Sequence, residues 1–102
     1  MGKVVYRFRF AESVPMAEVE SSLLLAIWAA ESLYGESQVH LDAGHAFDPE
    51  RRICIVATDT SVGCDLNRLF LGFLQREFDA DQFTVERVAE PRSPTPATTA
   101  RD

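Results

Sequence analysis

The densest group of residues that could do chemistry lies near the middle of the chain, where His40, Asp42, His45 and Asp48 follow one another closely. An imidazole can act as a general base while a carboxylate orients it, and the same side-chain types can bind a divalent metal. If residues 39–43 form a strand, side chains two positions apart share one of its faces, as His40 and Asp42 do. These residues and His45 are therefore candidate catalytic residues. The plainer interpretation is an exposed sheet face with cross-strand ion pairs, and no metal site is assigned.

A second polar group precedes a predicted helix and consists of Thr60, Ser61 and Gly63. Hydroxyl groups, a glycine and the free N–H groups of a helix start are the components of an anion-binding loop. Asp59 and Asp65 add negative charge beside it, and no lysine accompanies them. Every helix needs its first N–H groups satisfied, so we interpret the hydroxyls as helix caps and keep anion binding as the alternative.

Composition narrows the class of protein. The chain has 102 residues, of which 46% are hydrophobic and 25% charged, and this suits one soluble domain with one core. The net charge of -6 argues against a nucleic-acid or membrane partner, because both attract basic surfaces. The most apolar run, residues 23–30, is far shorter than the roughly 20 residues that cross a bilayer. Two cysteines are too few for a secreted disulfide scaffold, so we expect free thiols and a cytoplasmic location. No cofactor is implied.

The pattern of residue types changes near Glu90. Residues 91–102 contain three prolines and no large apolar side chain. Such a segment cannot bury enough surface to offset the entropy of ordering it. We therefore predict a single α+β domain over residues 1–90 and a disordered Pro/Thr-rich tail over residues 91–102.

The clearest element is a strand over residues 4–10, in which apolar and polar side chains alternate. Arg7 and Arg9 fix which face is dry, because an unpaired buried guanidinium costs too much free energy. Val5 shares their face. The opposite face carries Val4, Tyr6, Phe8 and Phe10.

The other elements follow from periodicity and turn residues. A run of apolar residues at 53–57 predicts a central strand buried on both faces. Asp48 and Pro49 suit the first two positions of a turn before it. The predicted elements are a strand at 4–10, a helix at 15–34, strands at 39–43 and 52–58, a helix at 64–78 and a strand at 83–89.

This order of strand, helix, strand, strand, helix, strand resembles the ferredoxin-like plait. The resemblance implies a four-stranded antiparallel sheet with both helices on one face and the first and third strands in the centre. The fold hosts many unrelated functions and therefore says little about activity. The third predicted strand has no aromatic side chain for stacking RNA bases, which argues against an RNA-recognition module.

The apolar residues on both faces of the third strand suggest association through the open face of the sheet. Val5 with either Cys54 and Val56 or Ile53 and Ile55 would form an apolar patch between the arginines. We therefore predict a small non-enzymatic interaction domain, as a homodimer or with another protein. The alternative is a small enzyme of the dimeric α+β-barrel kind, with a His/Asp acid-base site. The predicted interface residues are Val5, Arg7, Arg9, Val56, Glu86, Leu24 and Trp28.

Overall fold

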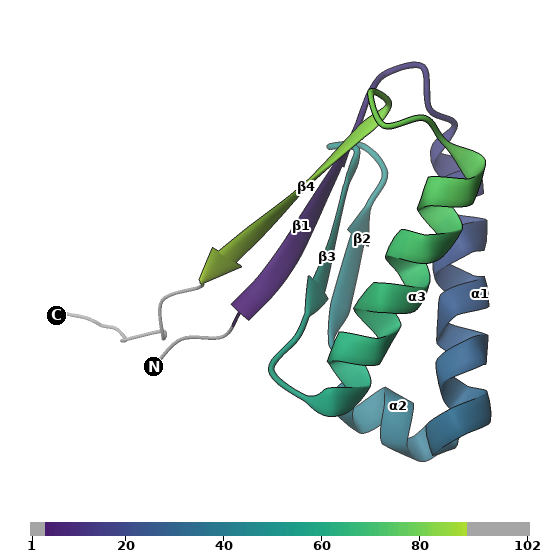
Figure 1. Ribbon diagram of the computed structural model, residues 1–102, viewed down its shortest axis with the longest axis vertical. Coiled ribbons are helices and arrows are strands. Elements are labelled where there is room, and N and C mark those ends of the chain that lie inside the picture. Colours follow the sequence, from purple (N-terminus) through teal and green to yellow (C-terminus); the bar gives the residue numbers. More distant parts are fainter. Residues whose placement is uncertain (1–3, 90–102) are drawn as a thin grey trace, which may run out of the picture.

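The computed structural model describes residues 4–89, and the predicted tail lies outside this range. Its class is α+β, with one four-stranded antiparallel sheet in the order β2-β3-β1-β4. Figure 1 shows α1 and α3 side by side on one face of the sheet, with α2 at their lower end. The strands are β1 Val4–Phe10, β2 His45–Asp48, β3 Ile53–Ala57 and β4 Phe83–Ala89. The helices are α1 Met16–Tyr34, α2 Glu36–Asp42 and α3 Ser61–Glu77.

The predicted division of β1 into two faces is confirmed. Phe8 is fully buried and meets Phe70 of α3 edge to face, with ring centroids 4.9 Å apart. Phe10 is also buried and stacks on Phe83 at 6.1 Å. The alternation of side chains along a strand sends Arg7 to the opposite face. The aromatic row of β1 thus anchors the sheet to the helices.

The strand β3 lies in the centre of the sheet beside β1, as its apolar run predicted. Cys54 pairs with Phe8 and Val56 pairs with Tyr6, so both point toward the helices, and both are fully buried. The expectation that Val56 belongs to the open face is therefore wrong. Ile53 and Ile55 occupy that face instead and are half-buried.

The predicted strand at 39–43 is also wrong, because these residues belong to helix α2 and its end. Gly35, with φ of 90°, ends α1 and lets the chain turn directly into α2. Val39 and Ala43 are four positions apart, share one helix face and are both buried. Leu41, counted as a strand residue, is 78% exposed. The observed strand β2 begins only at His45.

The helix α3 lies very close to the sheet at Gly63. A Cβ atom at this position would meet the backbone oxygen of Ala57 at 2.2 Å, so only glycine fits. Thr60 caps the same helix end, because its Oγ1 accepts the N–H of Gly63 at 2.9 Å. The start of α3 is therefore fixed to the end of β3 by close packing and by a cap.

We predict that Gly63→Ala lowers the free energy of unfolding by roughly 1–3 kcal/mol, the cost of overpacking a tight contact. The matched control is Gly72→Ala in the same helix, where an added Cβ meets nothing within 4 Å. That variant should gain roughly 0.5–1 kcal/mol from the better helix propensity of alanine. Urea unfolding followed by circular dichroism measures both. Equal effects of the two substitutions would contradict the close approach.

Candidate functional site

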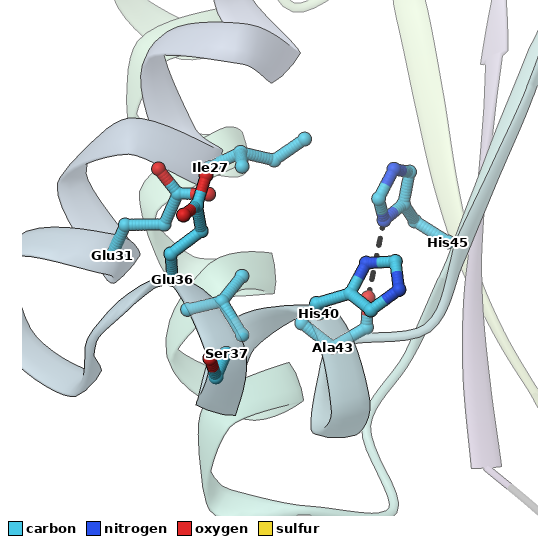
Figure 2. A pocket seen from close by; sticks show the side chains of 8 residues that line it. Ile27, Glu31, Glu36, Ser37, His40, Ala43 and His45 are labelled. Atoms are coloured by element: carbon cyan, nitrogen blue, oxygen red, sulfur yellow. Dashed lines mark hydrogen bonds between the residues drawn. The ribbon is translucent and has the colours of Figure 1, made fainter.

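The two histidines meet in one pocket. It has a volume of about 400 Å³ and lies where the end of α1, helix α2 and the start of β2 come together. Figure 2 shows the rings of His40 and His45 near each other, with the carboxylates of Glu31 and Glu36 across from them. Helix α2 supplies His40 and strand β2 supplies His45, so the expected shared strand face of His40 and Asp42 does not form. The pocket is lined by Ile27, Glu31, Glu36, Ser37, Val39, His40, Ala43 and His45.

The predicted aspartates do not line this pocket. The carboxylate of Asp42 accepts a hydrogen bond from Gln38 on its own helix. Asp48 is the last residue of β2, and its Oδ1 accepts the N–H of Arg51 in the following turn at 3.1 Å. The acidic residues of the pocket, Glu31 and Glu36, were missed because they flank the end of α1, and only the fold brings them to the histidines.

His45 has a defined hydrogen bond. Its Nδ1 lies 3.1 Å from the backbone oxygen of Ala43 (Figure 2). A carbonyl oxygen only accepts, so Nδ1 carries the proton and donates it. In the neutral ring this leaves Nε2 with a lone pair, as a general base requires. Within residues 4–89, no cluster of three or more His, Cys, Asp or Glu side chains is arranged to hold a metal ion.

A second pocket, of about 410 Å³, lies between β1, β4 and the first turns of α3. Asn67 forms part of its wall and is only 7% exposed. Its Oδ1 is buried and finds no hydrogen-bond partner among the described residues. Leaving such an oxygen unpaired costs about 1–3 kcal/mol. The lining residues are Val4, Tyr6, Thr58, Cys64, Asn67, Arg68, Leu71 and Arg87.

Nothing in the sequence singled out this second pocket. Asn67 lies at a helical spacing among the apolar residues Leu66, Phe70 and Leu74, where a packing role is the default expectation. Arg87 lies in a predicted strand, where the sequence indicates only that successive side chains alternate between the two faces of the sheet. A buried polar residue inside an apolar stripe was the available signal, and it becomes informative only when its burial is known.

Two of the three residues of the predicted anion loop, Thr60 and Gly63, are hydrogen-bonded inside the protein. The hydroxyl of Thr60 accepts from Gly63 and donates to the backbone oxygen of Asp42 at 2.6 Å. Ser61 is the first residue of α3 and is exposed. Thr60 therefore caps the helix and ties it to α2, which was the preferred interpretation.

Burial decides the chemistry of the cysteines, which are both free thiols. Cys54 is fully buried on β3, and burial raises the pKa of its thiol to about 12. It therefore stays protonated at neutral pH and acts as a packing residue. Cys64 is half-buried, and its Sγ lies 3.4 Å from the backbone oxygen of Thr58.

The open face of the sheet carries an ion cluster among apolar side chains. Glu86 accepts from Arg7 through Oε1 at 2.7 and 2.9 Å, and its Oε1 lies 3.6 Å from Arg9. The hydrogen bonds and charge of Arg7 lower the pKa of the Glu86 carboxyl, and the charge of Arg9 lowers it further. The strand register adds to this face Val5, Ala46, Asp48, Ile53, Ile55, Ala57, Thr84 and Val88.

A second apolar surface lies on the outer side of α1. Leu24, Leu25 and Trp28 are 44, 50 and 60% exposed. Leu24 and Trp28 are two of the predicted interface residues. Helix α3 packs against α1 without covering these three side chains.

No protein-family model, curated protein or solved structure matches this chain. No helix formed by residues 4–89 combines the length and the apolar character that a membrane span requires.

We predict that Arg7→Gln returns the pKa of the Glu86 carboxyl toward its ordinary value, whereas Arg9→Gln changes it less. The reason is that Arg7 supplies the two short hydrogen bonds. A lowered folded-state pKa gives stability that is present above the ordinary carboxyl pKa and is lost as the pH falls through the lowered value. Side-chain carboxyl signals in an NMR pH titration measure the shift. Equal effects of the two variants would contradict this assignment.

Proposed function

We propose that this chain is a small non-enzymatic interaction domain that pairs with a second copy of itself through the open face of its sheet. Its fold would be a ferredoxin-like plait to which α2 has been added. Three features support that fold: the central position of β1 and β3, the antiparallel pairing, and both long helices on one face. The addition occupies the connection between α1 and β2, where the plait itself has no helix.

The observation that carries the proposal is the two-sided character of β3. Its helix-facing side chains are fully buried, while Ile53 and Ile55 lie on the opposite face. Among residues 4–89, both long helices lie on the other side of the sheet and no element covers these isoleucines. Val88 extends the apolar surface onto β4. Burying such a surface against an identical one is favourable, since sheets stack about 10 Å apart with interlocking side chains.

The charges on this face suit a twofold dimer. Arg7 and Arg9 lie on the central strand β1, and the carboxylates of Asp48 and Glu86 lie on the two edge strands. In a twofold interface each surface meets its own copy, so both signs of charge must be present on one patch. Arginines at the centre and carboxylates at the edges satisfy this requirement when two sheets stack at an angle.

We predict that the chain sediments at twice its 11.4 kDa mass at micromolar concentration, and that Ile55→Lys converts it to a monomer. The lysine places an unpaired charge in the apolar centre of the interface. The matched control is Trp28→Lys, which puts the same charge on the outer side of α1, where the proposed dimer makes no contact. Thermal unfolding of each variant checks that it is folded.

A monomer at every concentration would overturn the proposal. So would a dimer that Trp28→Lys dissociates and Ile55→Lys leaves intact, because the contact surface would then be the helix.

The second candidate function is a small acid-base enzyme of the dimeric α+β-barrel kind, centred on His40 and His45. The observation that favours it is the hydrogen bond from His45 Nδ1 to Ala43, which leaves Nε2 available as a base. Glu31 and Glu36 replace Asp42 as the carboxylates of that pocket. Their negative charge favours a cationic or neutral substrate.

Long-range ¹H–¹⁵N NMR spectra test this candidate. We expect the neutral ring of His45 to be protonated at Nδ1 alone, because the carbonyl of Ala43 accepts that proton. His40 serves as the internal control for a ring in the same pocket. An Nε2-protonated His45 would exclude His45 as the base of this site and remove the observation that favours the enzyme.

A further inference from the structure

We propose that the pocket between β1, β4 and α3 binds a small organic acid that also carries its own hydrogen-bond donor, such as a hydroxy acid with an apolar body. Arg68 and Arg87 would hold the carboxylate, and Asn67 would accept the donor. This site lies on the helix side of the sheet and does not depend on the proposed dimer.

Asn67 contributes a buried amide group to this pocket. Asn67 lies on the face of α3 that packs against the sheet and is more than nine-tenths buried. Its Oδ1 reaches no donor among residues 4–89, although most buried polar atoms in proteins are paired. An apolar side chain would serve packing better at this position. This oxygen is closed to solvent in the present side-chain orientation, so a ligand O–H or N–H group would satisfy it once the amide turns toward the pocket.

The residues that line the pocket also carry positive charge. Arg87 pairs with Tyr6 in the sheet and so lies on the helix side of β4, in contrast to Glu86. Within the described chain, Arg87 makes no ion pair. Arg68 is mostly exposed and lies 4.0 Å from Asp65, at the limit of an ion pair. Two guanidinium groups at one pocket favour an anionic group, which arginine binds with two parallel hydrogen bonds.

The remaining lining residues decide between an inorganic anion and an organic one. Val4, Leu71 and the ring of Tyr6 contribute apolar surface to a volume of about 410 Å³. Ligand sites of this size, within the general range of about 300–1,000 Å³, hold an organic molecule and not a lone phosphate. The pocket therefore suits an acid whose body is apolar and whose donor lies beside the carboxylate.

The test uses three probes that differ by one group each. Mandelate has a phenyl ring, a carboxylate and a hydroxyl; phenylacetate lacks the hydroxyl, and methyl mandelate lacks the charge. NMR titration of the full ¹⁵N-labelled chain should show mandelate shifting the amides of Asn67, Arg68, Leu71 and Arg87. We expect mandelate to bind about fivefold more tightly than phenylacetate, for one added hydrogen bond, and methyl mandelate to bind at least about tenfold more weakly.

Variants separate the two contacts. Asn67→Leu should abolish the preference for mandelate over phenylacetate, and Arg87→Gln should weaken both acids about tenfold. Arg76→Gln is the matched control, because this arginine lies in the last turn of α3 and does not line the pocket. The dimer-breaking variant Ile55→Lys should bind mandelate as the natural chain does.

Three results would overturn the proposal. The first is the absence of localised shifts with either acid. The second is a preference for mandelate that persists in Asn67→Leu. The third is equally tight binding of inorganic phosphate, which would indicate a general anion site.

Discussion

The packing of Phe8 against Phe70 is the interaction on which the rest of the structure depends. Phe8 lies in the central strand β1, and Phe70 lies in the middle of α3, so their contact fixes the helix layer over the sheet. Because side chains alternate along a strand, burying Phe8 sends Arg7 and Arg9 to the opposite face. One buried aromatic row therefore creates both the core and the uncovered charged face.

The same constraint shapes the two pockets. Both lie at edges of the interface between sheet and helices, where apolar packing gives way to polar side chains. In the pocket of His45, the polar groups come from α1, α2 and β2, and one imidazole nitrogen is already hydrogen-bonded to the backbone. In the pocket of Asn67, a buried oxygen is left without a partner in the described chain. A hydrogen-bonded group mainly stabilises the fold, whereas a buried polar group without a partner is uncommon and requires an explanation.

Two predictions were wrong, the strand at 39–43 and the place of Val56 on the open face, because the local pattern of residue types was ambiguous at both. The window at 39–43 is too short to separate a period of two from a helical spacing of four, and Val39 and Ala43 satisfy both. For Val56, an apolar run carries no alternation, so its residues alone do not reveal which ones face the helices. Pairing with β1 decides this, because Val56 lies opposite Tyr6 and Ile55 lies opposite Arg7.

The sequence by itself determined the α+β class, the two faces of β1, the long helices and the turn before β3. These features depend on contacts between near neighbours along the chain and on the cost of burying charge. Only the tertiary structure decided that His45 shares a pocket with Glu31 and Glu36, and that Arg87 shares one with Asn67. Such meetings join residues far apart in the chain, and strand register and helix packing set them. No local pattern of residue types records that geometry.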